Sequence, residues 1–219
     1  MVIDNLFIGY TGSHGIGAGS TKNLTVRNCE IGWIGGSVQG EDVQTRFGNA
    51  IEIYGAADGY YVYNNYIYQC FDCGPTVQVG VTLTPGKKVY QKNVEFYDNV
   101  CWDADLEVWL TSTPDNTETT FAKLVDCKLY NNYVTMSGYG WSAYNHQKNE
   151  YCAFYGAGET GADHINCYVK DNYFWNLRYQ LWKAVPTSMN DDLGFKWVNN
   201  TVIHREGALL GALGTDTKT

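Results

Sequence analysis

The sequence predicts an all-β fold, a parallel β-helix of about seven coils, because one short motif recurs along the whole chain. Each copy reads apolar, variable, Asn or Asp, usually Asn, variable, apolar, and the third positions of successive copies are 24, 36, 34, 33, 40 and 28 residues apart. Self-similarity at such a period is typical of a solenoid. Six clear copies begin at Val26, Val62, Phe96, Leu129, Val169 and Trp197, and a seventh fits at Val2.

The repeated segments have the pattern of strands. Helical repeats need apolar residues at i, i+3 and i+4 over ten or more positions, and no stretch of the chain has them. The segments instead alternate with period two and are rich in Val, Ile, Tyr and Phe. An Asx side chain in each coil can bond the turn backbone and its counterpart one coil away. An unpaired buried amide costs about 1–3 kcal/mol, so we expect a mutually bonded ladder at one turn, with plain surface turns as the alternative.

Three stretches near the amino terminus are residues 13–16 (Ser-His-Gly-Ile), 23–36 and 46–52. They resemble those of bacterial β-helix repeat proteins. The chain is similar over nearly its whole length to the right-handed parallel β-helix proteins of the pectate-lyase-like superfamily. That resemblance implies three strands per coil, an asparagine ladder between the second and third strands, and action on polysaccharides.

No catalytic residue transfers from the well-known members of that superfamily. Polygalacturonase-type hydrolases carry an Asn-Thr-Asp segment, a paired-Asp segment and a Gly-His-Gly segment. Here Asp191-Asp192 is the only adjacent acidic pair without another role, and the other two segments are absent. The Arg- and Lys-based sites of Ca²⁺-dependent pectate lyases are not visible either.

Composition limits the possible partners and the domain organisation. The 219 residues are 44% hydrophobic and 17% charged, which suits one β-helix domain over residues 1–219, a rod about 34 Å long. The net charge of −8 argues against nucleic acid and against anionic membranes. No run of 18 apolar residues suggests membrane insertion. We expect a secreted or cell-surface bacterial protein whose partner is a polysaccharide or oligosaccharide. Because the first residues enter a repeat without a cap or leader, and residues 208–219 form a Gly/Ala/Thr-rich tail, we also expect a fragment of a longer protein.

The seven cysteines do not predict a disulfide framework or a metal centre. Cys101 replaces an inward Ile or Val, which indicates a core residue. Cys127 and Cys167 should stack on adjacent coils about 4.8 Å apart. A free pair is favoured there, and a disulfide is the alternative. Cys70-x-x-Cys73 is a lone pair, which is a weak zinc signal, so no metal site is predicted.

The first strand of each coil should follow the long variable loop and precede the repeated segment. Its expected copies are residues 14–17, 49–54, 75–79, 104–109, 152–155 and 180–182. We align the inward residues Ile16, Ile51, Val77, Leu106, Phe154 and Leu181, so that their neighbours point outward. The outward column then reads Gly17, Glu52, Gln78, Glu107, Tyr155 and Trp182, and the next reads Tyr54, Gly80 and Trp109.

This outward strip carries the functional hypothesis. The alignment puts Glu52 and Glu107 two coils apart, about 9.6 Å between backbones. Inverting glycosidases hold their two carboxyls about 6.5–9.5 Å apart, one protonating the leaving oxygen and one activating water. Solvated surface carboxylates are the plain alternative, and Asp105 with Glu107 could instead bind Ca²⁺. Substrate contacts are expected from Tyr54, Trp109, Gln78 and Asn49, the aromatic pair offering flat surfaces to sugar rings.

His14 and Arg46 extend the catalytic candidates to elimination chemistry. A lyase that acts on uronic acids needs a base and a cation that neutralises the carboxylate, and these two residues fall at or just before the first-strand face. The alternatives are a turn histidine and a surface ion pair of Arg46 with Glu41 or Asp42. We expect a carbohydrate-active enzyme, hydrolysis preferred over elimination; the alternative is a non-catalytic glycan-binding or adhesive β-helix module.

The variable position inside the repeat forms a second outward column. Three aromatic members flanked by cations suit glycan stacking or a subunit contact, while direct stabilisation of neighbouring strands is an equally good explanation. The column reads Arg27, Tyr63, Tyr97, Tyr130, Lys170 and Val198.

Overall fold

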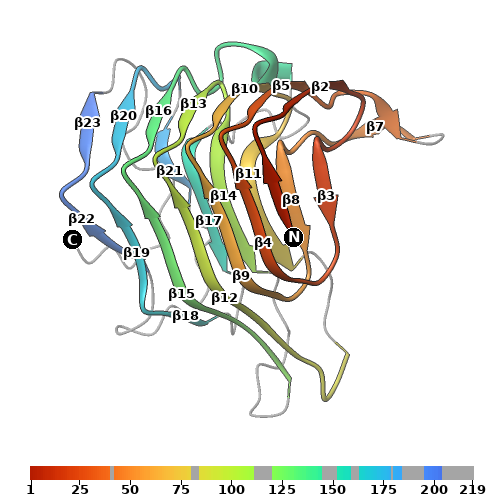
Figure 1. Cartoon of the computed structure of the whole chain (residues 1–219), viewed down its shortest axis with the longest axis vertical. Coiled ribbons are helices and arrows are strands. Elements are labelled where there is room, and N and C mark those ends of the chain that lie inside the picture. The colour runs from red at the N-terminus through yellow and green to blue at the C-terminus, as the bar shows by residue number, and fades with distance from the viewer. Residues whose placement is uncertain are drawn as a thin grey trace.

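The chain forms a parallel β-helix, in which three sheets of parallel strands enclose one core (Figure 1). The computed structural model describes residues 1–39, 42–79, 84–110, 120–144, 152–158, 163–178, 180–183 and 195–203. In each complete coil the chain runs through one strand of each sheet, in the order C, A, B, where the three sheets are named A, B and C as described below. The predicted fold class is confirmed, including the three strands per coil that the resemblance implied.

The strands of each sheet follow one another in coil order. Sheet A contains β1 (Val2–Asp4), β4 (Thr21–Arg27), β9 (Ala57–Tyr63), β12 (Lys88–Tyr97), β15 (Phe121–Tyr130), β19 (Cys167–Lys170) and β22 (Phe195–Val198), with β18 (Asp163–Ile165) also paired to β15. Sheet B contains β2 (Phe7–Thr11), β5 (Glu30–Ile34), β10 (Tyr66–Cys70), β13 (Val100–Trp102), β16 (Tyr133–Thr135), β20 (Tyr173–Trp175) and β23 (Thr201–Ile203). Sheet C contains β3 (Ile16–Ala18), β8 (Ile51–Tyr54), β11 (Cys73–Val79), β14 (Asp105–Leu110), β17 (Cys152–Gly158) and β21 (Gln180–Lys183).

Two short elements lie outside these sheets. Strands β6 (Val38–Gln39) and β7 (Asp42–Arg46) pair antiparallel and project from the rod (Figure 1). A 3₁₀ turn, η1 (Trp141–Tyr144), follows β16. No helix in the described part of the chain is long and apolar enough to cross a membrane.

A ladder of buried asparagines lines the turn between sheets A and B, as predicted. Each ladder amide donates to the next one at 3.0 Å, and each also donates to a backbone carbonyl at 2.8–3.0 Å. Cys29 begins the column, and its N–H donates to the first ladder oxygen. The ladder thus satisfies the amides that burial would otherwise leave without partners. Its members are Asn65, Asn99, Asn132, Asn172 and Asn200.

The third and fourth positions of the repeat have different roles in this turn. The ladder occupies the fourth position, and the third holds a residue in the left-handed backbone region, with φ between 52° and 56°. Asn and Asp tolerate that conformation better than other side chains that carry a Cβ, which explains why the third position is always one of them. These residues are Asn5, Asn28, Asn64, Asp98, Asn131, Asp171 and Asn199. Asn5 holds the third position because Ile3 pairs with Val26, so the first copy begins at Ile3, one residue later than the predicted start at Val2.

Two further left-handed columns turn the chain where no motif marked them. One divides the strands of sheet A and contains Asn23, Gly59, Asn93, Asp126 and Asn166. The other lies at or just after the ends of the sheet B strands and contains Tyr10, Trp33, Gln69, Asp103, Met136 and Asn176. Four of these six are residue types without a preference for this conformation, so the neighbouring coils must impose it there.

Residues 137–142 form a strap that runs back over earlier coils. Trp141 donates its backbone N–H to Gln69 Oε1 at 2.7 Å and its indole N–H to the carbonyl of Gly35 at 3.4 Å. Its ring meets Phe71 edge-on, with centroids 5.7 Å apart. Arg178, from a later coil, donates to the carbonyl of Gly138 at 2.9 Å. The strap therefore joins residues up to 106 positions apart in sequence.

Cysteine placement follows the prediction. Cys101, Cys127 and Cys167 are fully buried in the core, and Cys127 and Cys167 are free thiols on adjacent strands. Cys70 and Cys73 are also buried, and neither forms a disulfide. The described residues contain no group of three or more His, Cys, Asp or Glu side chains suited to a metal ion.

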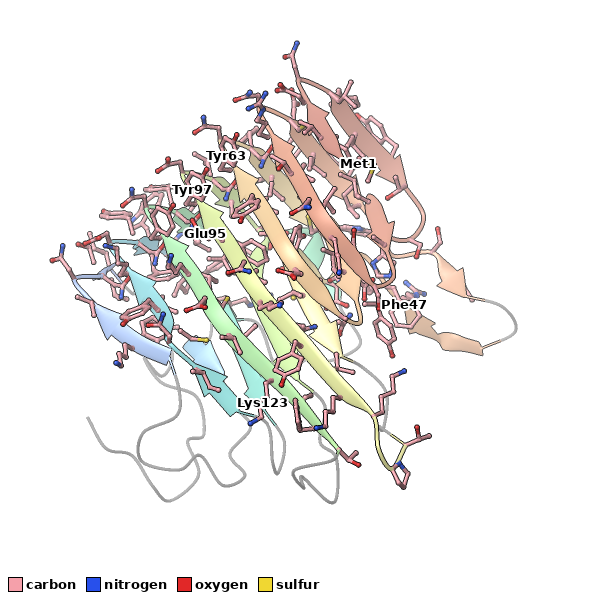
Figure 2. All side chains as sticks on the ribbon, turned by 60° about the horizontal axis from the view of Figure 1, so that its bottom comes forward. Met1, Phe47, Tyr63, Glu95, Tyr97 and Lys123 are labelled. Carbon is pink, nitrogen blue, oxygen red and sulfur yellow. The ribbon has the colours of Figure 1, made fainter. Side chains whose placement is uncertain are left out.

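The outward tyrosines of sheet A stack on one another. The ring centroids of Tyr63 and Tyr97 are 4.7 Å apart, and those of Tyr97 and Tyr130 are 4.9 Å apart with planes 1° from parallel (Figure 2). Arg27 donates to the Tyr63 hydroxyl at 3.0 Å, and Tyr130 donates to Glu95 at 3.0 Å. Both faces of the Tyr97 ring are covered by its neighbours, which favours the structural explanation of this column over sugar stacking.

Candidate functional site

The strands of sheet C bring the predicted acidic positions into one column. Glu52 pairs with Thr76, and Thr76 pairs with Glu107, so the two glutamates lie two coils apart on the same face. That part of the prediction is confirmed at the level of the backbone. The side chains of Glu107 and Trp109 lie outside the described residues, so their roles stay predictions.

Gln78 was placed in the wrong row. It pairs with Tyr54 and with Trp109, two residues beyond the expected position between the glutamates. Strand β11 begins earlier than predicted, and its register against β14 shifts between Cys73 and Thr76. A two-residue shift keeps every side chain on its predicted face, which is why the alternation of the sequence did not reveal it.

The row predicted for the last coil of sheet C is also wrong. Phe154 pairs with Trp182 rather than with Leu181, although Leu181 is buried in the core as predicted.

Four of the predicted site residues form one hydrogen-bonded network around Glu52. The Gln78 side-chain amide donates to Glu52 Oε1, and His14 Nε2 lies 2.6 Å from Glu52 Oε2. The backbone N–H of Asn49 donates to His14 Nδ1 at 3.3 Å, and Asn49 Oδ1 accepts the N–H of Cys73 at 2.9 Å. Only 7% of the Glu52 side chain is exposed, against 23% for His14. Glu52 is therefore a fixed carboxyl rather than a solvated surface group.

His14 approaches Glu52 from the segment that precedes β3. Position 17 in the same column is a glycine, and a Cβ there would come no closer than 3.9 Å to the His14 Cβ. The imidazole also lies near Phe47, with ring centroids 5.9 Å apart, where the β6–β7 hairpin meets the rod (Figure 2). The preceding loop thus folds its histidine over the start of the outward column.

Tyr54 and Arg46 lie beside this network rather than within it. Tyr54 is 41% exposed, and burial together with the charge of Glu52 raises the pKa of its hydroxyl. Arg46 ends β7 and is half-buried. Within the described part of the chain no hydrogen bond or ion pair connects Arg46 to Glu52 or His14. The side chains of Glu41 and Asp42, its predicted ion-pair partners, are outside the described residues.

Asp105 belongs to a second buried polar cluster beneath the strap. It is 5% exposed and accepts a hydrogen bond from the Ser137 hydroxyl. The neighbouring Asp103 accepts from the backbone N–H and the hydroxyl of Ser142, at 3.1 and 2.5 Å. Burial raises the pKa of Asp103, while the bonds from Ser142 act against that rise. Asp105 therefore contacts the strap, and the calcium alternative that joined it to Glu107 stays a prediction.

No sequence pattern pointed to Asp103, Ser137 or Ser142. Their partners come from coils that are 32 to 39 residues apart, and no spacing rule links them. Only the strap brings them together.

The arrangement as a whole presents one rigid carboxyl on the outer face of sheet C, with a second carboxyl position in its column and an aromatic residue beside it. No family model, no curated protein and no solved structure matches this chain.

Proposed function

We propose that this chain is a carbohydrate-active enzyme that hydrolyses a polysaccharide along the outer face of sheet C. The observation that carries the proposal is the column Glu52–Thr76–Glu107. Two strand spacings separate its carboxyl positions by about 9.6 Å at the backbone. Side chains that lean toward each other would bring the carboxyls into the range of about 6.5–9.5 Å that inverting glycosidases use.

The neighbouring column supports a sugar-binding role for the same face. Tyr54 and Trp109 occupy one row, on either side of Gln78. Aromatic side chains two coils apart would give successive sugar rings apolar surfaces, with the Gln78 row between them. A secreted or cell-surface location suits such a substrate.

Hydrolysis is better supported than β-elimination. Both ring nitrogens of His14 are engaged, one by Glu52 and one by the N–H of Asn49, so the imidazole has no free nitrogen with which to take a proton from a sugar. The cation expected to assist it, Arg46, forms no hydrogen bond with it among the described residues. The catalytic candidates are therefore Glu52 and Glu107, with Asp105, His14 and Arg46 in lesser roles.

A broad panel of polysaccharides tests the proposal, with release of new reducing ends as the readout. We expect turnover of at least one member by the wild-type protein, and loss of about 10²-fold or more in Glu52→Gln and in Glu107→Gln. Glu30→Gln is the matched control, because Glu30 is an exposed carboxyl on sheet B that accepts a hydrogen bond from Tyr68. Ultraviolet absorbance from unsaturated uronate would identify a lyase instead.

A non-catalytic glycan-binding or adhesive module is the second candidate, and exposed aromatic residues on and beside the outer face of sheet B favour it. Trp33, Tyr66 and Trp175 are 45%, 46% and 42% exposed. If the wild-type protein retains oligosaccharides but releases no ends from any polysaccharide, this candidate replaces the enzyme. Trp175→Ala should then weaken retention, while Glu52→Gln should not.

A further inference from the structure

We propose that Glu52 is the proton acceptor of this site and that His14 and Gln78 are the positioning residues that hold it in that role. The inference rests on the proposed function, because it assigns the two carboxyl positions of that site different tasks. It makes Glu52 the base that activates water and leaves the acid role to the Glu107 position.

The hydrogen bonds of His14 decide whether the proton between His14 and Glu52 lies on the imidazole nitrogen or on the carboxyl oxygen. The N–H of Asn49 points to Nδ1, so this nitrogen must be the acceptor and carries no hydrogen. The ring proton of a neutral imidazole then lies on Nε2, the nitrogen 2.6 Å from Glu52 Oε2. His14 therefore donates, and Glu52 accepts.

Gln78 imposes the same direction on the other oxygen. Its amide nitrogen faces Glu52 Oε1, and an amide nitrogen only donates. A protonated carboxyl would need an acceptor for its O–H, and neither neighbour offers one. Both oxygens of Glu52 are thus committed to accepting hydrogen bonds, as a carboxylate does.

The carboxylate keeps the capacity to act on a water molecule. Its two oxygens have about four acceptor positions, and the two contacts use two of them. The remaining 7% exposure of the side chain admits a small molecule more readily than a sugar ring. In the resulting step a water proton passes to Glu52 while the water oxygen bonds to the anomeric carbon. The glycosidic C–O bond breaks, and the leaving oxygen takes a proton from the acid on the opposite side.

Nitrogen NMR of the histidine rings tests the hydrogen-bond directions without any polysaccharide. The His14 resonances are assigned by their loss in His14→Phe. At neutral pH we expect a proton on Nε2 and none on Nδ1, and a carboxyl-carbon shift of Glu52 typical of the ionised form. A proton on Nδ1 with a bare Nε2 would make Glu52 the donor and overturn the assignment.

Kinetics on a polysaccharide that the wild-type protein cleaves test the positioning role. His14→Phe and Gln78→Met remove one donor each, and we expect kcat to fall about tenfold with KM within about twofold. His14→Gln restores an amide donor and should recover most of that loss. Asp4→Asn, which breaks an exposed ion pair with Arg27 on the first coil, is the control and should change neither constant.

Two outcomes separate this inference from the function on which it rests. An unchanged kcat with a lowered unfolding midpoint in His14→Phe would show that the contact only fastens the first coil, and would overturn the positioning role. If no polysaccharide is cleaved, the proposed function fails, and the NMR result alone still decides whether His14 and Gln78 donate to Glu52.

Discussion

Removal of one central ladder amide should destabilise the rod far more than removal of a terminal one. In Asn132→Ala the backbone N–H of Asn99 loses the acceptor it reaches at 3.2 Å, the Asn99 amide loses one of its two acceptors, and the carbonyl of Phe96 loses the donor at 2.9 Å. Asn132 is 1% exposed, so water cannot replace these bonds. Asn172 Oδ1 also loses one of its two donors from residue 132 and keeps only the backbone N–H. One fully orphaned and three partly orphaned groups should lower the free energy of unfolding by about 3 kcal/mol.

Asn200 provides the matched control because it makes similar bonds at a wetter position. Its side chain accepts two hydrogen bonds from Asn172 and donates to the carbonyl of Val169, but it is only half-buried. Water can satisfy the exposed groups, so Asn200→Ala should cost about 1 kcal/mol. Urea unfolding followed by tryptophan fluorescence measures both variants. Equal losses of unfolding free energy in the two variants, at equal slopes against urea, would refute the argument that burial makes the ladder hydrogen bonds more stabilising.

Three further predictions concern the strap, its buried acid and the core thiols. Gly36→Ala should lower the free energy of unfolding by about 1–3 kcal/mol and change the Trp141 emission, because φ is +88° and the new Cβ would lie 2.5 Å from the Trp141 ring. The control Gly19→Ala has nothing within 4 Å of its new Cβ and should change the free energy of unfolding by no more than about 0.5 kcal/mol. Similar losses in both variants would count against the strap contact. Burial raises the pKa of Asp103 above its ordinary 3.8, so the native protein binds the proton of this carboxyl more tightly than the unfolded chain does. The resulting stabilisation of the native state is fully present below pH 3.8 and is lost as the pH rises through the pKa of Asp103 in the native protein. Asp103→Asn should remove that loss from a curve of unfolding free energy against pH, and a wild-type protein that gains on the variant with rising pH would contradict it. Burial raises the pKa of Cys127 well above its usual range and that of Cys167 to about 12, so mass spectrometry after iodoacetamide treatment should find both unmodified in the native protein and alkylated after unfolding.

The repeat predicted the fold because the same turn chemistry recurs in successive coils. A buried amide at one turn and a left-handed residue beside it both require Asn or Asp, so the same letters recur wherever the chain turns between sheets A and B. The turn at the ends of the sheet B strands has no recurring residue type in the sequence. There Trp33, Gln69 and Met136 adopt the same left-handed backbone without any residue preference that the sequence could display.

For the site, the alternation of the sequence predicted the face that each residue occupies but not its row. Period-two patterns establish which face a side chain occupies, so Glu52, Gln78 and Glu107 were correctly placed on one face of sheet C. The same patterns are blind to a shift of two residues, which is why Gln78 appeared beside Glu52 in the wrong row. Even so, its long side chain spans the offset and donates to Glu52. The alternation thus predicted the face of Gln78, whereas its hydrogen bond to Glu52 was not predicted.

The strap changes how a rod of this kind should come apart. In a solenoid whose coils touch only their neighbours, stability is a sum of local terms, and the ends can peel away one coil at a time. Here Gly35, Gln69 and Asp103, from three successive coils, are all hydrogen-bonded to residues 141–142. Loss of the coil that contains Gly35 would uncover part of a segment anchored more than a hundred residues later. The front half of the molecule should consequently melt as one cooperative block rather than unravel stepwise.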